Sequence, residues 1–158
     1  MRNADEEFPD CPIPGGNSPI MQLTRAADYG ARVMIHFAGL EPGARTSLPE
    51  IARAVQVPEH FLSKVLQMLS KRGLIQSHRG ASGGFELAAD AASVTLLDVI
   101  EAFEGPIQLN VCLGERGSCC RKSWCPAHLV WAEAQEALVG VLRGASIAAL
   151  AGSVQRTA

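Results

Sequence analysis

Five soft or borderline metal donors, four thiols and one imidazole, lie within residues 112–128 of this chain. They are Cys112, Cys119, Cys120, Cys125 and His128. Thiolate and imidazole groups are the ligands that zinc ions and iron–sulfur clusters prefer. Only Cys11 stands elsewhere, and the surrounding segment is polar and contains glycine, so these cysteines do not fit a hydrophobic core. The pattern predicts a metal or iron–sulfur site.

Two other uses of the same donors stay open. A structural zinc ion could take Cys112, one of the vicinal pair Cys119 and Cys120, Cys125 and His128 as a tetrahedral set. The spacing departs from the tight Cys-x-x-Cys pairs of many zinc sites. A thiol-based redox sensor without metal could use the vicinal pair, or a bond between Cys112 and Cys125.

The composition favours a small, mostly helical protein. Of its 158 residues 47% are hydrophobic but only 5% aromatic, and the net charge is −2. Residues 1–20 are acidic and rich in Pro and Gly, which predicts a disordered leader without the apolar core of a secretory signal. No apolar run is long enough to span a membrane. We therefore expect a cytoplasmic protein with no membrane association. Because the cytoplasm is reducing, clustered cysteines there are more often metal ligands than partners in disulfide bonds.

Local signals predict a helix-turn-helix after the leader. Thr24 can cap a first helix that Pro42-Gly43 ends, and Ser47 with Glu50 forms a capping box for a second. Pro58 suits the first turn of a third helix, which Gly73 closes. The apolar stripe expected on this third helix is Phe61, Leu62, Val65, Leu66 and Leu69.

The rest of the chain predicts a wing and further helices. Residues 74–77 and 85–87 are short β-capable runs around a glycine-rich loop, as in a hairpin. Thr95 can cap a helix that Gly105-Pro106 stops, and a long helix is expected over about 126–143, with Ser146 capping a last short one. The fold class is therefore mainly α with a small β-hairpin wing: a winged helix-turn-helix plus a long C-terminal dimerisation helix.

The charge pattern of the third helix and the hairpin predicts DNA binding. No carboxylate stands between Glu59 and Glu86, whereas the stretch holds four Lys or Arg residues. Such a helix can enter the major groove and a glycine-rich wing the minor groove. The candidate DNA contacts are His60, Ser63, Lys64, Gln67, Arg79, Gly80 and Ser82. No phosphate-cradling loop or paired carboxylates indicate an enzyme.

Four segments together resemble the Rrf-two family of bacterial winged-helix regulators. They are residues 21–30, 57–66, 79–85 and 94–100, and the resemblance covers about 21–152. The family includes the iron–sulfur sensors IscR, NsrR and RirA. The resemblance implies a homodimeric transcription regulator, typically a repressor, that binds a palindromic operator. Its signal would be nitric oxide, iron or redox status, sensed through a 2Fe-2S or 4Fe-4S cluster.

The resemblance also implies which residues are ligands. Three loop cysteines bind the cluster in the family: Cys112 and Cys125 match the outer two, and Cys119 is favoured over Cys120 as the middle one. NsrR-like members add an aspartate from the partner subunit, which Asp28 matches, and IscR-like members add a histidine, which His128 matches. Asp28 is the fourth ligand that we expect, with His128 as the alternative.

The expected domain limits follow from the same segments. They are 1–20 for the leader, 21–90 for the DNA-binding domain, 91–152 for the connecting helix, the cysteine loop (112–128) and the dimerisation helix, and 153–158 for a tail.

Overall fold

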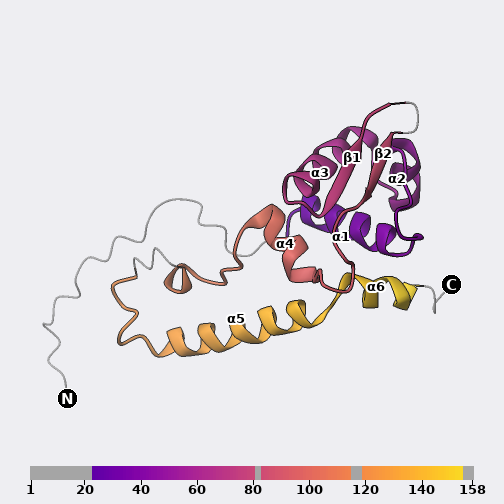
Figure 1. The fold of residues 1–158 in the computed structure, drawn as a ribbon. Helices are drawn as coiled ribbons and strands as arrows, with labels where there is room; N and C mark the ends of the chain where they lie inside the picture. The colour runs from indigo at the N-terminus through magenta and orange to yellow at the C-terminus, as the bar shows by residue number, and fades with distance from the viewer. Residues whose placement is uncertain (1–22, 81–82, 115–118, 155–158) are drawn as a thin grey trace, which may run out of the picture. The chain divides into compact units, whose positions relative to one another are not determined.

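The computed structural model describes residues 23–80, 83–114 and 119–154 and forms two compact units. One unit holds Leu23–Ile107 together with the chain from Leu138 onward, and the other holds Gln108–Ala137. The elements, in order, are α1 (Arg25–Ala38), α2 (Leu48–Val55), α3 (Glu59–Lys71), β1 (Ile75–His78), β2 (Gly84–Leu87), α4 (Leu96–Glu104), the 3-10 turn η1 (Val111–Leu113), α5 (Pro126–Gly144) and α6 (Ile147–Val154) (Figure 1). This arrangement confirms a mainly helical fold with a two-stranded wing. The leader expected over 1–20 and residues 155–158 of the expected tail lie outside the described residues.

Side-chain caps fix where the helices of the first unit begin. At α2 the amide and hydroxyl of Ser47 both donate to Oε2 of Glu50, at 2.9 and 2.6 Å. At α4 the amide of Thr95 donates to Asp98 at 2.8 Å, and the amide of Asp98 donates back to Oγ1 of Thr95 at 3.2 Å. Each pair satisfies amides that a helix start leaves free. The capping predictions are confirmed at both helices.

A tight turn separates α2 from α3. Gln56 takes a left-handed conformation with φ of 54°, and the buried Val57 follows it. Pro58 then has ψ of 137° and precedes the first helical residue, Glu59. The prediction that Pro58 lies within the first turn was wrong by one residue, because its extended ψ makes it the cap of α3.

The core of the unit that holds α1 collects buried side chains from α1, α2, α3, β1, α4 and α6. Its fully buried side chains include Val33, Met34, Ile51, Leu62, Leu66 and Leu69. Four of the five apolar residues predicted to line α3 are buried there. Phe61 was wrongly predicted to be buried: its side chain is 51% exposed.

The wing is an antiparallel hairpin in which Ile75 pairs with Leu87 and His78 with Gly84. The strands begin one residue away from the predicted bounds. Leu74 is excluded from β1 because its amide closes the end of α3 by donating to Leu69 at 3.0 Å. Gly84 extends β2, and a Cβ at this position would lie 2.9 Å from the carbonyl oxygen of Thr46.

The segment before α2 adds to the hairpin. Thr46 and Phe85 exchange two backbone hydrogen bonds of 3.0 and 2.9 Å. Strand β2 of the wing is therefore hydrogen-bonded to β1 on one side and to the α1–α2 loop on the other.

The start of α6 is bonded to the segment before α4. The amide of Leu96 donates to Ala145 at 2.8 Å, and that of Ile147 donates to Val94 at 2.9 Å. Ser146 caps α6 as predicted, accepting from the amide of Ala149 at 3.2 Å. No side chain of α5 is buried. None of the helices in the described residues has both the length and the apolar character that crossing a membrane requires.

Candidate functional site

The outer face of α3 carries the predicted major-groove residues. His60, Lys64 and Gln67 are exposed on the side opposite the buried stripe. Ser63 is partly buried, and its hydroxyl donates to the carbonyl of Glu59 at 2.9 Å. Three of the four predicted side chains are therefore free to contact DNA, while Ser63 retains only its acceptor capacity.

In the wing, the cationic side chain of Arg79 stands next to two positions, Gly80 and Gly83, whose backbone disfavours any residue with a Cβ. Arg79 and Gly80 are exposed, and Gly80 has φ of 107°. The amide of Gly83 donates to Gly80 at 2.9 Å, and a Cβ on Gly83 would lie 2.6 Å from the carbonyl oxygen of His78. Ser82, the remaining predicted contact, lies outside the described residues.

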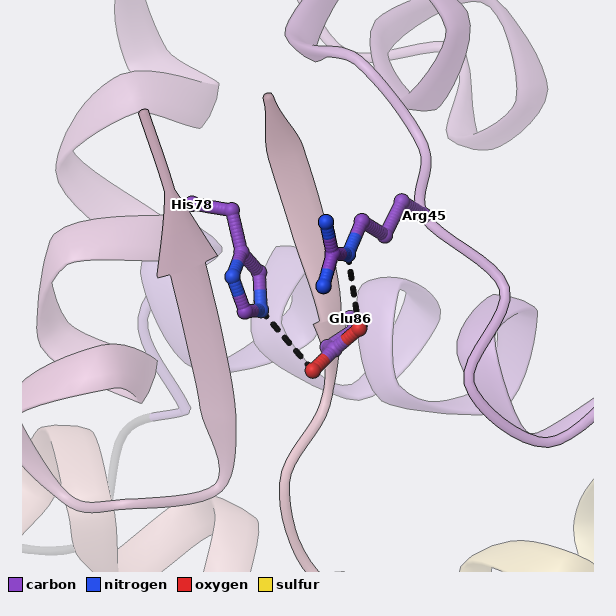
Figure 2. Close-up of polar contacts among 3 residues, drawn as sticks. All are labelled: Arg45, His78 and Glu86. Atoms are coloured by element: carbon purple, nitrogen blue, oxygen red, sulfur yellow. Dashed lines mark hydrogen bonds and ion pairs between the residues drawn. The ribbon is translucent and has the colours of Figure 1, made fainter. Parts of the chain in front are cut away.

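An ion-pair cluster that sequence reasoning missed joins the wing to the α1–α2 loop. Figure 2 shows Glu86 of β2 between Arg45 of the loop and His78 of β1. Nε of Arg45 lies 3.1 Å from Oε2 of Glu86, and Nε2 of His78 lies 2.8 Å from Oε1. The hydrogen bond from Arg45, and then that from His78, lowers the pKa of Glu86 below its ordinary value of 4.5. The contact is non-local, so spacing along the sequence gave no signal for it.

The cysteine segment contains three free thiols. Cys112 is 6% exposed within η1, whereas Cys119 and Cys125 are half-buried. Cys120 is disulfide-bonded. Turns wind the chain from Cys119 to Cys125: the amide of Lys122 donates to Cys119 at 3.1 Å, and that of Cys125 donates to Arg121 at 2.8 Å.

The described donors are not assembled into a closed site. Within the described ranges, which omit 115–118, no three His, Cys, Asp or Glu side chains are grouped to hold a metal ion. The chemistry of the donor set nevertheless fits a cluster, because thiolates are its usual ligands. Any such centre would require the segment to close around it, as ligation often orders a loop.

The two candidates for a fourth ligand differ in their surroundings. Asp28, exposed in the first turn of α1, forms an ion pair of 2.9 Å with Arg32. His128 lies in the first turn of α5, and its backbone amide donates to the carbonyl of Cys125 at 3.1 Å. Its buried Nδ1 has no hydrogen-bond partner within the part of the chain that the structure describes.

A helix-turn-helix followed by a hairpin wing defines a DNA-binding regulator of the winged-helix class. Residues 23–153 match the Rrf2 (Rrf-two) family, described as iron-dependent transcriptional regulators. The chain is 33% identical over 131 residues to the HTH-type transcriptional regulator NsrR of Geobacillus kaustophilus (strain HTA426), a match that spans 82% of this chain and 89% of that protein.

Solved structures agree with this match. CymR, the global cysteine regulator of B. subtilis, superposes with a TM-score of 0.71 at 30% identity, over 84% of this chain and 98% of that one. IscR of T. potens superposes with a TM-score of 0.69 at 23% identity, over 87% and 90%, which shows a shared fold. The chain belongs to the Rrf2 family of DNA-binding transcriptional regulators and is not an enzyme.

Proposed function

We propose that the chain regulates transcription in response to an iron–sulfur cluster bound by its cysteine segment. The observation that carries the proposal is the set of three free thiols at Cys112, Cys119 and Cys125. When bound, the cluster supplies a redox-active centre. Nitric oxide, iron supply and redox status are the candidate signals.

The contacts around the donors support a particular ligand set. We favour Cys119 as the middle ligand, as its free thiol supports. We now favour His128 over Asp28 as the fourth ligand, because the buried Nδ1 of His128 has no hydrogen-bond partner among the described residues, whereas Asp28 is exposed and paired with Arg32.

The course of α5 supports coupling between ligation and DNA binding. Cys125 directly precedes α5, so binding at its thiolate would restrain the first turn of this helix. The carbonyl of Ala145, just beyond its last residue, accepts from the amide of Leu96 at the start of α4, and both residues lie in the unit that contains α1, α2 and α3. A change in the cysteine segment would thus act on a helix whose far end belongs to that unit.

The DNA interface we propose is the outer face of α3 together with the wing. Its charge supports this, since the exposed Lys64, Lys71, Arg72 and Arg79 lie on the two elements and can neutralise phosphates. His60, Gln67 and the acceptor oxygen of Ser63 would meet base edges, with Arg79, Gly80 and Ser82 at the minor groove. We also propose that residues 21–90 form the DNA-binding domain and that residues 91–152 contain the connecting helix, the cysteine loop and the dimerisation helix.

The exposed side of α5 supports a homodimer as part of the proposal. Val130, Ala134, Ala137 and Val141 recur at intervals of three and four residues, and both valines are well exposed. This spacing forms an apolar seam along a helix, and pairing it with the same seam of a second copy would bury it. A two-fold dimer would read a palindromic operator.

A thiol-based regulator without a cluster is the second candidate. The free thiols and the similarity to CymR, the global cysteine regulator of B. subtilis, support it. Structural zinc on the same donors is the third.

Metal and sulfide analysis tests these candidates. The full chain is purified without air, and iron, zinc and acid-labile sulfide are counted per chain. We expect iron with sulfide and a broad visible absorption, lost in Cys112→Ser, Cys119→Ser and Cys125→Ser but kept in the control Cys120→Ser. Zinc without sulfide would establish the zinc site instead. Absence of every metal, together with oxidant-dependent DNA binding, would establish the thiol sensor.

A further inference from the structure

Phe61, a large apolar residue of α3 that was expected to be buried, is exposed instead. Phe61 is 51% exposed, and its ring centroid lies 4.3 Å from that of His60. Met68, seven residues further along, is 38% exposed. Because seven residues make nearly two turns, the two side chains lie on one flank of the helix, with Lys64 between them.

The surroundings of this flank indicate an anionic partner. No carboxylate occurs from residue 60 to residue 85, and the neighbouring exposed side chains on α3 include His60, Lys64 and Lys71. A protein partner selected by an apolar patch alone would not require this cationic setting. DNA satisfies both features, because its phosphates are anionic and its major groove carries one exposed apolar group, the C5 methyl of thymine.

We propose that Phe61, supported by Met68, contacts a thymine methyl group in the major groove and so determines part of the sequence specificity. The inference rests on the proposed DNA interface of α3. It assigns to that interface an apolar contact beside the polar contacts of His60 and Gln67, and it makes the helix selective for A·T at one position of each half-site.

The test combines protein and DNA changes. A duplex that the full chain prefers is first selected from a random pool, and each symmetric pair of thymines is then replaced by deoxyuridine, which lacks only the methyl group. At the thymine position that Phe61 contacts, we expect the wild-type chain to lose about fourfold in affinity for each methyl group removed, which is the usual effect of burying one CH2 group. Phe61→Ala should bind both duplexes equally, whereas Phe61→Leu should keep part of the preference.

Two controls separate failure of the inference from failure of the interface. Lys64→Ala should weaken binding to both duplexes alike and lower its salt dependence. Circular dichroism of each variant checks that the half-exposed Phe61 is not needed for folding. One outcome overturns the inference about Phe61 but leaves the proposed DNA interface intact. In that outcome Lys64→Ala weakens binding, but Phe61→Ala does not remove the effect of any thymine methyl group. If neither variant alters binding to any duplex, α3 is not the DNA helix and both are overturned.

Discussion

The ring of Phe103 in α4 occupies the space where a side chain on Gly30 of α1 would lie. A Cβ on Gly30 would overlap the ring edge, so only glycine lets the two helices approach this closely. The contact fixes α4, which leads toward the cysteine segment, against the first helix of the DNA-binding unit.

Gly30→Ala should therefore destabilise the protein by about 1–3 kcal/mol, the usual cost of overpacking a core. Chemical denaturation followed by circular dichroism measures the free energy of unfolding. Gly152→Ala is the matched control: outside the backbone of α6 itself, no atom of the described residues lies within 4 Å of its Cβ position, so it should be neutral or stabilising by up to about 1 kcal/mol. Equal effects of the two substitutions would contradict the role of the contact.

The wing should loosen in acid because Glu86 loses its charge. Its pKa is lowered in the folded state by Arg45 and His78, so the stabilisation is present above its ordinary pKa of 4.5 and is lost as the pH falls through the lower folded value. Glu86→Gln should lower the melting temperature at neutral pH, and its curve should approach that of the wild type in acid.

Glu41→Gln, an exposed carboxylate of the α1–α2 loop, is the control for the loss of one charge. Melting curves from pH 7 to pH 3 compare the three chains. A constant offset between wild type and Glu86→Gln at every pH would show that the ion pairs do not cause the difference.

Much of the first unit could be predicted because its signals are local. Ser47 with Glu50, and Thr95 with Asp98, cap helices through contacts three residues apart, which a sequence displays directly. Phe61 was misplaced because helical periodicity sets it beside Leu62 and Val65, and only the packing of α1 and α2 decides where the buried stripe ends.

The missed parts depend on contacts between distant residues. Thr46 joins Phe85, and Arg45 joins Glu86, across some forty positions, and no local pattern marks either pair. The cysteines were recognised by type and spacing. Their closure into a site could not be derived, because it depends on a ligand as well as on the chain.

Arg79→Ala should weaken operator binding by about 5- to 100-fold, because one guanidinium at the minor groove is lost from the wing. Binding is measured by fluorescence anisotropy at several salt concentrations. Arg79→Lys keeps the charge but not the planar group, so it should recover the salt dependence without full affinity. Unchanged affinity and sequence preference in Arg79→Ala would remove the wing from the interface.

Val141→Asp should dissociate the proposed dimer. Val141 is 73% exposed on α5, and a carboxylate buried in an apolar seam would be strongly unfavourable. Sedimentation velocity should show a monomer at concentrations where the wild type is dimeric. Arg143→Asp, two residues along and hence on the other side of the helix, is the control and should stay dimeric. A monomeric wild type would contradict the dimer itself.

His128→Ala and Asp28→Ala should separate the two candidates for the fourth ligand. If His128 binds the cluster, its loss should lower the iron content and visible absorption of anaerobically reconstituted protein, while Asp28→Ala should retain both. Neither change should unfold the chain, because alanine favours a helix and the exposed pair of Asp28 with Arg32 contributes at most about 1 kcal/mol. Thermal unfolding of the metal-free chains checks this. If only Asp28→Ala lost iron, the fourth ligand would instead be Asp28, and its ion pair with Arg32 would be broken when the cluster binds.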